Sequence, residues 1–265
     1  MINKVINLRE DIEPYPTLTT YVLDDPMEKN TKRPAILVCP GGGYGFCSPR
    51  EAEPIAMQYN AAGFHAFVLN YSVAPNKYPR ALEGVSKSIQ LIRENADVWN
   101  VESGSIAVIG FSAGAHLAGS IGMFWNREPV KTQDESNRPN AVILAYPVVT
   151  SGEFAHRGSF ENLCGDNEDL IKEMSLENQV TGDTPPMFIW HTVADQSVPV
   201  ENSLMLAGAL RKKNIPFELH IYPEGAHGLS TATLDVGVDG TGISSNVKGW
   251  VQLSVNWLND LFTNR

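Results

Sequence analysis

Cysteine is scarce in this chain, and basic side chains are outnumbered by acidic ones. The 265 residues include three cysteines, Cys39, Cys47 and Cys164, without metal-ligand spacing. Such a sparse, odd set argues against a disulfide scaffold and favours a reducing compartment. Twenty Lys and Arg against thirty Asp and Glu give a formal net charge of −10. We therefore expect no nucleic-acid partner, because a phosphate backbone is held by clustered basic side chains.

Long hydrophobic runs are missing too. No segment approaches the roughly 20 apolar residues of a membrane span. The first ten residues hold neither a continuous apolar region nor a small-residue cleavage site, so they do not read as a signal peptide. We expect a cytoplasmic protein with no membrane partner. Repeats and low-complexity tracts are also lacking, and at 43% hydrophobic residues the chain can bury one large core, so we expect a single domain over residues 1–265.

What the chain does contain is a regular alternation of short apolar strands and longer helical segments. The expected strands cover residues 18–23, 35–39, 66–70, 105–109, 141–145, 187–190 and 217–222. The expected helices cover residues 51–62, 79–95, 113–120 and 200–213, with a closing helix over residues 247–261. Alternation of this kind indicates parallel strands joined by helical crossovers. The polar turn between the first two strands predicts an antiparallel N-terminal hairpin. The fold class is therefore α/β, a mostly parallel sheet with helices on both faces.

Two segments interrupt this alternation. Residues 150–184 are polar, turn-rich and only partly helical, which predicts an insertion close to the functional site. Residues 235–242 are a glycine-rich loop to which the sequence assigns no role. In open α/β sheets, ligands bind beyond the carboxyl ends of the strands. The residues that directly follow each expected strand are therefore the candidates for function.

The stretch Gly110–Gly114 places a serine between an apolar strand and a helix of small residues. This context is typical of a nucleophile elbow, a sharp turn that holds Ser112 in a strained conformation above the sheet edge. Neighbouring chains press close to such a turn. Gly110 and Gly114 fit there because a side chain would collide.

A glycine run, Pro40–Tyr44, follows an earlier strand directly. Its missing side chains let backbone N–H groups approach a ligand, as an oxyanion hole requires. The expected donors are the amides of Gly42 and Gly43, together with that of Ala113, which follows the serine. Neither a Walker lysine nor GxGxxG spacing is present, which argues against a phosphate-binding loop.

Asp195 and His227 follow two later strands, which end near His191 and at Tyr222. An aspartate in this place either caps the next helix or holds a histidine in one tautomer. His227 lies in a loop of small residues that can reach the serine. The order Ser112, Asp195, His227 is the order known for this arrangement of strands, which predicts a nucleophile, an acid and a base.

The remaining histidines fit the role of base less well. His116 lies one helical turn beyond the serine, which predicts a packed residue beneath the elbow. His65 and His220 fall at the start of a strand or within one, and His156 falls in the insertion. His191 is a candidate for lining the pocket. No metalloenzyme motif is present, so no metal is expected.

Three segments, Pro40–Tyr44, Arg50–Ala56 and Gly110–Ala118, resemble the α/β-hydrolase superfamily. Within it they resemble the bacterial carbohydrate esterases, a branch of acetyl esterases, acetylxylan esterases and xylanase-B-like proteins. The resemblance implies removal of acetyl or other small acyl groups from sugars, with Ser112 as nucleophile, Asp195 as acid, His227 as base and no cofactor. The small-molecule partner would be an acylated sugar. Pro40 stands where hormone-sensitive-lipase-like proteins have histidine, a departure from that group.

Two other functions share the same features. One is an amide hydrolase of the same fold, a small peptidase or a formamidase. The other is a non-catalytic binding protein on a hydrolase scaffold, although no expected catalytic residue is missing.

Aromatic side chains are the candidates for a sugar platform, because carbohydrate rings stack on aromatic faces. These candidates are Tyr44, Phe46, Tyr71, Phe111, Trp125 and Trp190. Core packing is the default for most of them. Only Tyr44, beside the expected oxyanion loop, is expected to contact substrate. No long apolar lid segment is present, which argues against long-chain lipids.

Overall fold

All named strands of the computed structural model belong to one eight-stranded sheet. The structure describes residues 1–265 except 10, 12, 14–15, 28–30, 238–241 and 264–265. The strands are β1 (Val5–Asn7), β2 (Thr17–Tyr21), β3 (Arg33–Cys39), β4 (His65–Asn70), β5 (Val101–Phe111), β6 (Ala141–Ala145), β7 (Met187–Thr192) and β8 (Phe217–Tyr222). Their order across the sheet is β1-β2-β4-β3-β5-β6-β7-β8. Among the named strands only the pairs β1–β2 and β2–β4 are antiparallel and the other five pairs are parallel, which confirms the mostly parallel α/β fold.

The antiparallel N-terminal hairpin is present, but its strands differ from the expected pair. It is formed by β1 and β2, and β2 then pairs antiparallel with β4. The expected partner, residues 35–39, lies in β3 between β4 and β5 and runs parallel to both. Residues 35–39 are all buried, as suits a central strand covered on both faces. The pairing was wrong because a continuous apolar run marks a central strand, whereas β1 is too short and exposed to show a pattern.

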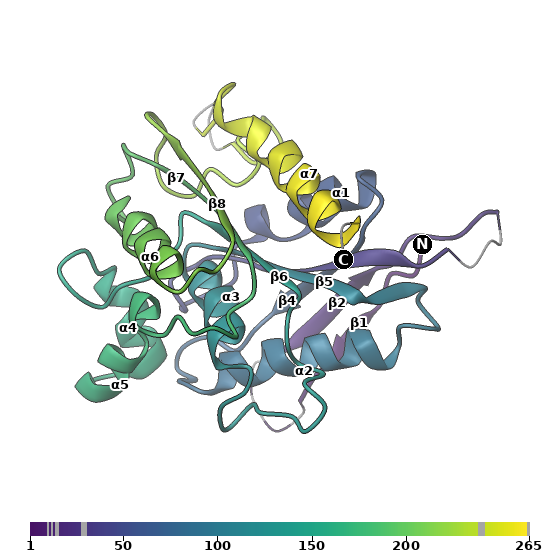
Figure 1. Cartoon of the computed structure of the whole chain (residues 1–265), viewed down its shortest axis with the longest axis horizontal. Coiled ribbons are helices and arrows are strands. Elements are labelled where there is room, and N and C mark those ends of the chain that lie inside the picture. The colour runs from purple at the N-terminus through teal and green to yellow at the C-terminus, as the bar shows by residue number, and fades with distance from the viewer. Residues whose placement is uncertain (10, 12, 14–15, 28–30, 238–241, 264–265) are drawn as a thin grey trace.

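Helices cover both faces of the sheet (Figure 1). The helices are α1 (Glu53–Ala61), α2 (Arg80–Glu94), α3 (Ala113–Phe124), α4 (Arg157–Cys164), α5 (Glu168–Glu173), α6 (Glu201–Lys212) and α7 (Trp250–Thr263), with short 3-10 turns η1 (Pro49–Glu51), η2 (Leu176–Asn178) and η3 (Val247–Gly249). One face is covered by α1 and α7, and the other by α2, α3 and α6. The two apolar cores therefore lie on opposite sides of the sheet.

The two irregular segments differ in how much of them the structure describes. Residues 150–184 contain α4, α5 and η2. In the segment 235–242, residues 238–241 lie outside the described part of the chain. No helix within the described ranges is both long and apolar enough to span a bilayer.

The turn between β5 and α3 leaves no room for side chains at its two glycines. A Cβ atom on Gly110 would collide with the carbonyl of Gly114, and one on Gly114 would collide with the carbonyls of Cys39 and Pro40. Every residue of α3 is buried, so the helix has no solvent side toward which it can shift. The absence of two side chains therefore lets the start of α3 lie against the ends of β3 and β5.

We expect Gly114→Ala to destabilise the fold, because the added methyl group meets two backbone carbonyls that cannot rotate away. Overpacking of this kind costs about 1–3 kcal/mol or more. For a chain of this size each kcal/mol lowers the Tm by about 2–4 °C. The matched control is Gly208→Ala in α6, where no atom lies within 4 Å of the added Cβ. Helix propensity predicts that the control gains about 0.5–1 kcal/mol. Calorimetry that found equal Tm values for the two variants would contradict the packing argument.

Candidate active site

Ser112 lies on the turn from β5 to α3 with backbone angles φ 54° and ψ −118°. This conformation is strained for a residue with a side chain, and it is typical of functional turns. The surrounding backbone holds it in place, since the Ser112 amide donates to the carbonyl of Ala145 at 3.0 Å and its carbonyl accepts from Val148 at 3.2 Å. The hydroxyl is thereby directed toward His227, with Oγ 2.8 Å from Nε2.

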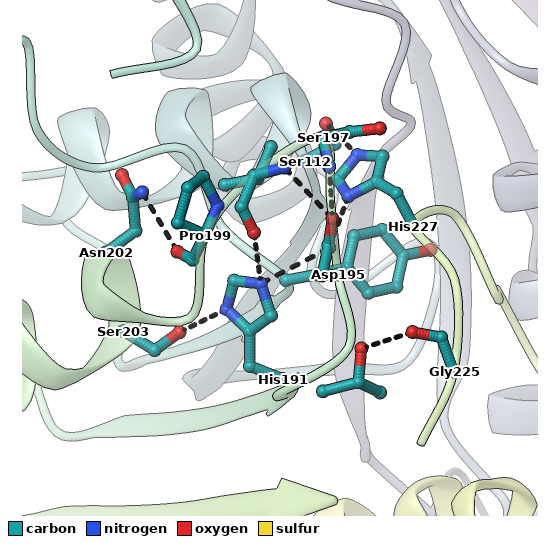
Figure 2. A network of polar contacts seen from close by, with 12 residues as sticks. Ser112, His191, Asp195, Ser197, Pro199, Asn202, Ser203, Gly225 and His227 are labelled. Carbon is teal, nitrogen blue, oxygen red and sulfur yellow. Dashed lines mark hydrogen bonds and ion pairs between the residues drawn. The ribbon is translucent and has the colours of Figure 1, made fainter. Parts of the chain in front are cut away.

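His227 bridges the serine and a buried aspartate (Figure 2). Its Nδ1 lies 2.6 Å from Oδ2 of Asp195. Because an ionised carboxylate only accepts, Nδ1 carries the hydrogen and Nε2 accepts from the Ser112 hydroxyl. The loop that holds His227 is tied to β7 where the Thr192 hydroxyl donates to the carbonyl of Gly225 at 2.8 Å. The structure thus brings together Ser112, Asp195 and His227 as the sequence predicts.

The carboxyl of Asp195 is fully surrounded by donors. Its Oδ1 accepts from the amides of Ser197 and Val198, both at 2.9 Å. Its Oδ2 contacts both His227 and, at 3.3 Å, Nε2 of His191. Burial by itself would raise the pKa of this carboxyl, but the hydrogen bonds from His191 and His227 outweigh burial and hold the pKa below its usual range. Asp195 is therefore ionised at neutral pH.

His191 supports Asp195 and does not line the pocket. The residue is completely buried. Its Nε2 lies 2.9 Å from the carbonyl of Val198, and its Nδ1 lies 2.8 Å from the hydroxyl of Ser203 (Figure 2). Because a carbonyl can only accept, Nε2 carries the hydrogen and shares it between Val198 and Asp195. The sequence places this residue near Asp195, but its orientation depends on Ser203 in α6.

The glycine run forms a tight turn beside the serine. Gly42 and Gly43 have φ values of 127° and 62°, which residues with a side chain rarely adopt. A Cβ atom on Gly42 would also collide with the backbone carbonyl of Phe46. The Gly41 amide is engaged, because it donates to Oε2 of Glu51 at 2.9 Å. The predicted donors Gly42 and Gly43 line the same cleft as the serine.

Ala113, the third predicted donor, is the first residue of α3. An amide at this position has no acceptor within its own helix. It also sits at the positive end of the helix dipole, where negative charge is stabilised. Its place directly after Ser112 is therefore suited to an oxyanion on the same side as the glycine amides.

Glu51 is a buried carboxyl in this cleft that the sequence did not single out. Its Oε1 accepts from the Tyr146 hydroxyl at 2.6 Å, while Oε2 accepts from Gly41. The Tyr146 oxygen accepts in turn from the Ser230 amide at 3.0 Å, and the Tyr146 ring packs edge-on against His227 with centroids 5.0 Å apart. Burial raises the pKa of Glu51, although both hydrogen bonds act in the opposite direction. One side chain thus links the glycine turn to the histidine loop.

The sequence carries little signal for this link. Glu51 and Tyr146 are 95 positions apart, and a glutamate just before a helix usually reads as a solvated first-turn residue. The only available indication is that Glu51 falls within the segment Arg50–Ala56, which carries part of the family resemblance.

Ser112 and His227 line a cleft of about 440 Å³. Its described lining consists of Gly42, Gly43, Phe46, Ser48, Arg50, Glu51, Ser112, His156, Ser197, His227 and Gly228. Segment 150–184 reaches this cleft through His156, and Asn162 in α4 donates to the carbonyl of Gly43 at 2.9 Å.

Tyr44, which the sequence predicts to contact substrate, does not line this cleft. It is only 2% exposed, and its hydroxyl lies 2.8 Å from Nδ1 of His116. The positive φ values of Gly43 and Tyr44 turn the chain, so the ring enters the core while Phe46 faces the cleft. The expected contact of Tyr44 with substrate is therefore not supported by its position, because the ring is buried away from the cleft lining.

His116 is packed beneath the elbow, as expected. Its Nε2 lies 2.8 Å from the carbonyl of Met174, so Nε2 carries the hydrogen and Nδ1 accepts from the Tyr44 hydroxyl. Burial lowers the pKa of His116 to about 4, despite the opposing effect of the Met174 carbonyl. The ring is therefore neutral at neutral pH and ties α3 to the segment after α5.

A second cleft, of about 490 Å³, lies at the amino ends of the parallel strands. Its lining includes Arg93, Arg138 and Asn140, and none of the residues predicted for the site. The Arg93 guanidinium is occupied there by the carbonyls of Ser136 and Arg138. Nowhere in the described ranges do three or more potential metal ligands gather.

A mostly parallel sheet with helices on both faces and a serine on a strained strand-to-helix turn defines an α/β-hydrolase. The chain belongs to the BD-FAE family, which matches residues 23–210.

Similar proteins include two curated relatives. The chain is 42% identical over 230 residues to endo-1,4-beta-xylanase B of Butyrivibrio fibrisolvens. This match covers 82% of the chain and 35% of that protein. It is also 32% identical over 215 residues to an acetylxylan esterase of Xylanibacter ruminicola. This second match covers 78% of the chain and 43% of that protein. The chain thus spans less than half the length of either relative.

A similar solved structure matches nearly end to end. It is an acetyl ester-xyloside bifunctional hydrolase from Caldicellulosiruptor lactoaceticus, with a TM-score of 0.86 and 39% identity over 97% of this chain and 96% of that one. The expected superfamily and its carbohydrate-esterase branch are confirmed by these matches.

We expect changes at Glu51 to impair turnover more than substrate binding, because Glu51 positions the glycine turn. Glu51→Gln keeps an acceptor for Gly41 but cannot accept from Tyr146, whereas Glu51→Ala leaves both donors unpaired. Glu51→Gln loses one hydrogen bond and Glu51→Ala loses two, so kcat should fall about tenfold in the first variant and about a hundredfold in the second. KM for p-nitrophenyl acetate should change less than about twofold.

The matched control for this prediction is Glu53→Gln, an exposed carboxyl at the start of α1. It should retain the wild-type kcat. Melting temperatures measured on all three variants separate the two roles. If Glu51 had only a structural role, both Glu51 variants would have a lower Tm, but the kcat of the folded enzyme would stay at the wild-type value. That outcome would contradict the prediction.

Proposed function

We propose that this chain is a serine esterase that hydrolyses short-chain acyl esters, acetyl esters above all, on carbohydrates. The observation that carries the proposal is the continuous hydrogen-bonded chain from Ser112 through His227 to Asp195 at the mouth of a cleft. Likeness to an acetylxylan esterase and to an acetyl ester-xyloside hydrolase supports acylated sugars as the substrate class. A cytoplasmic location remains a prediction, supported by three cysteines that form no disulfide.

In the proposed acylation step, Oγ of Ser112 attacks the ester carbonyl carbon while its proton passes to Nε2 of His227. Asp195 stabilises the imidazolium that forms, and its hydrogen bond to Nδ1 keeps the ring in the reactive orientation. The imidazolium then donates its proton to the leaving sugar oxygen as the carbon–oxygen bond breaks. The acyl group remains on Ser112 as an ester.

The oxyanion formed in that step is held by the amides of Gly42, Gly43 and Ala113. Donors of this kind are worth about 3 kcal/mol each when they are fixed in advance toward the developing charge. The positive φ values at Gly42 and Gly43 and the start of α3 supply that fixed orientation.

Deacylation repeats the same proton transfers with water in place of the serine hydroxyl. His227 removes a proton from the water as the water oxygen attacks the acyl carbon. The proton then returns to Oγ of Ser112 as the acid leaves. The free serine is restored, and the step requires no further reactant.

We expect Ser112→Ala to lower kcat by about 10⁶ and Asp195→Asn by about 10⁴, because the first removes the nucleophile and the second leaves His227 in the wrong tautomer. The matched control is Ser103→Ala, an exposed serine at the start of β5. Initial rates with p-nitrophenyl acetate provide the measurement. A fluorophosphonate probe should label the wild-type protein and the control but not Ser112→Ala. An unlabelled wild-type protein would instead favour a binding protein without catalysis.

We expect the enzyme to prefer short acyl chains, because among the described lining residues only Phe46 has a large apolar side chain. Burying each additional methylene stabilises a complex by about 0.8 kcal/mol where an apolar channel exists. Without such a channel, kcat/KM should fall at least about tenfold from p-nitrophenyl acetate to the octanoate. Assays with an aminoacyl amide and N-formylkynurenine test the amide alternative. A faster reaction with either amide, or a preference for octanoate, would contradict the proposal.

A further inference from the structure

The aromatic residues that the sequence offers as a sugar platform separate into one exposed residue and several buried ones. The buried side chains, each no more than 6% exposed, are Tyr44, Tyr71, Phe111, Trp125 and Trp190. Phe46 is 60% exposed, and it lines the cleft beside Ser112. In the part of the chain that the structure describes, it is the only aromatic residue among the large hydrophobic side chains that are exposed.

The position of Phe46 is fixed by the same turn that forms the predicted oxyanion loop. Its amide and that of Gly45 both donate to the carbonyl of Gly42, at 3.2 and 2.9 Å. The ring lies against Gly42, with its Cδ2 atom 3.1 Å from the position that a Cβ would occupy. The Phe46 ring therefore lies next to Ser112, and the hydrogen bonds of the glycine turn hold its backbone in place.

The rest of the cleft around Phe46 is polar. Arg50 is anchored there because its Nε donates to the carbonyl of Val236 at 2.5 Å. His156 Nδ1 lies 2.8 Å from the hydroxyl of Ser159, and the residue lines the cleft. Ser48 and Ser197 add hydroxyl groups to the lining. A simple alkyl group in this cleft could form no hydrogen bond with the hydroxyls of Ser48 and Ser197 or with the other polar side chains of the lining.

We propose that the cleft is a subsite for the sugar ring that carries the acyl group. The C–H face of a pyranose ring stacks on Phe46, and the ring hydroxyls bond Arg50, His156 and Ser197. A sugar ring fits because it has one apolar face and a polar rim, the same combination that the cleft presents. A volume of about 440 Å³ is sufficient for a small ligand. The inference rests on the proposed function and deepens it by assigning a residue to the choice of alcohol.

The test compares two acetate esters that share the acyl group but differ in the alcohol, a mono-O-acetylated methyl xyloside and ethyl acetate. Phe46→Leu keeps an apolar side chain but removes the aromatic face, whereas Phe46→Tyr keeps the face. We expect Phe46→Leu to lower the ratio of kcat/KM for the sugar ester to that for ethyl acetate about tenfold, chiefly through KM. Phe46→Tyr should hold the ratio within about twofold of wild type. Loss of one stacking contact accounts for a change of this size.

The matched control is Leu204→Ala, a change in a 50% exposed side chain of α6 that does not line the cleft. It should leave both rates unchanged. An equal loss on both esters in Phe46→Leu would overturn the inference, since it would place the ring against the acyl group or in support of the glycine turn. An equally lowered ratio in Phe46→Tyr would overturn it too. Wild-type protein that cleaves ethyl acetate but not the acetylated xyloside would instead contradict the proposed function.

Discussion

The rest of the site depends on the close approach of α3 to the ends of β3 and β5. Gly114 lies so near the carbonyls of Cys39 and Pro40 that no side chain fits between them. This contact brings the glycine turn that follows β3 beside the serine that follows β5. The strained conformation of Ser112 is maintained by the same packing, because every residue of α3 is buried. A single steric constraint thus positions both the proposed nucleophile and the proposed oxyanion donors.

Much of this arrangement is predictable because the relevant signals are local. The apolar runs 141–145 and 217–222 coincide with β6 and β8, since each run is bounded by polar or turn residues. The elbow is recognised from five consecutive residues and the strand and helix around them. Asp195 and His227 follow from the rule that parallel strands place their carboxyl ends at one edge. Prediction therefore succeeds where chain order and strand direction decide position.

Prediction fails where the deciding contact is distant in sequence. The expected hairpin partner of β2 is β3, but β2 pairs with β1 and β4. Buried Glu51 pairs with Tyr146, which follows β6, two strands away from β3 in the sheet order. In the glycine turn, the positive φ values of Gly42, Gly43 and Tyr44 turn the chain so that the Tyr44 ring enters the core and Phe46 faces the cleft. Composition and periodicity cannot predict such contacts, because each contact forms only when distant parts of the chain meet in the folded protein.

Two buried carboxyls, those of Asp195 and Glu51, lie near His227, and they differ in the number of hydrogen bonds that they accept. Asp195 receives hydrogen bonds from the amides of Ser197 and Val198 and from two histidines, so its pKa is held low despite burial. Glu51 receives only two hydrogen bonds, and burial raises its pKa. The donors around Asp195 therefore favour its ionised form beside His227. In the proposed mechanism Asp195 is the carboxyl that stabilises the imidazolium, whereas Glu51 acts on the glycine turn through its hydrogen bonds with Gly41 and Tyr146.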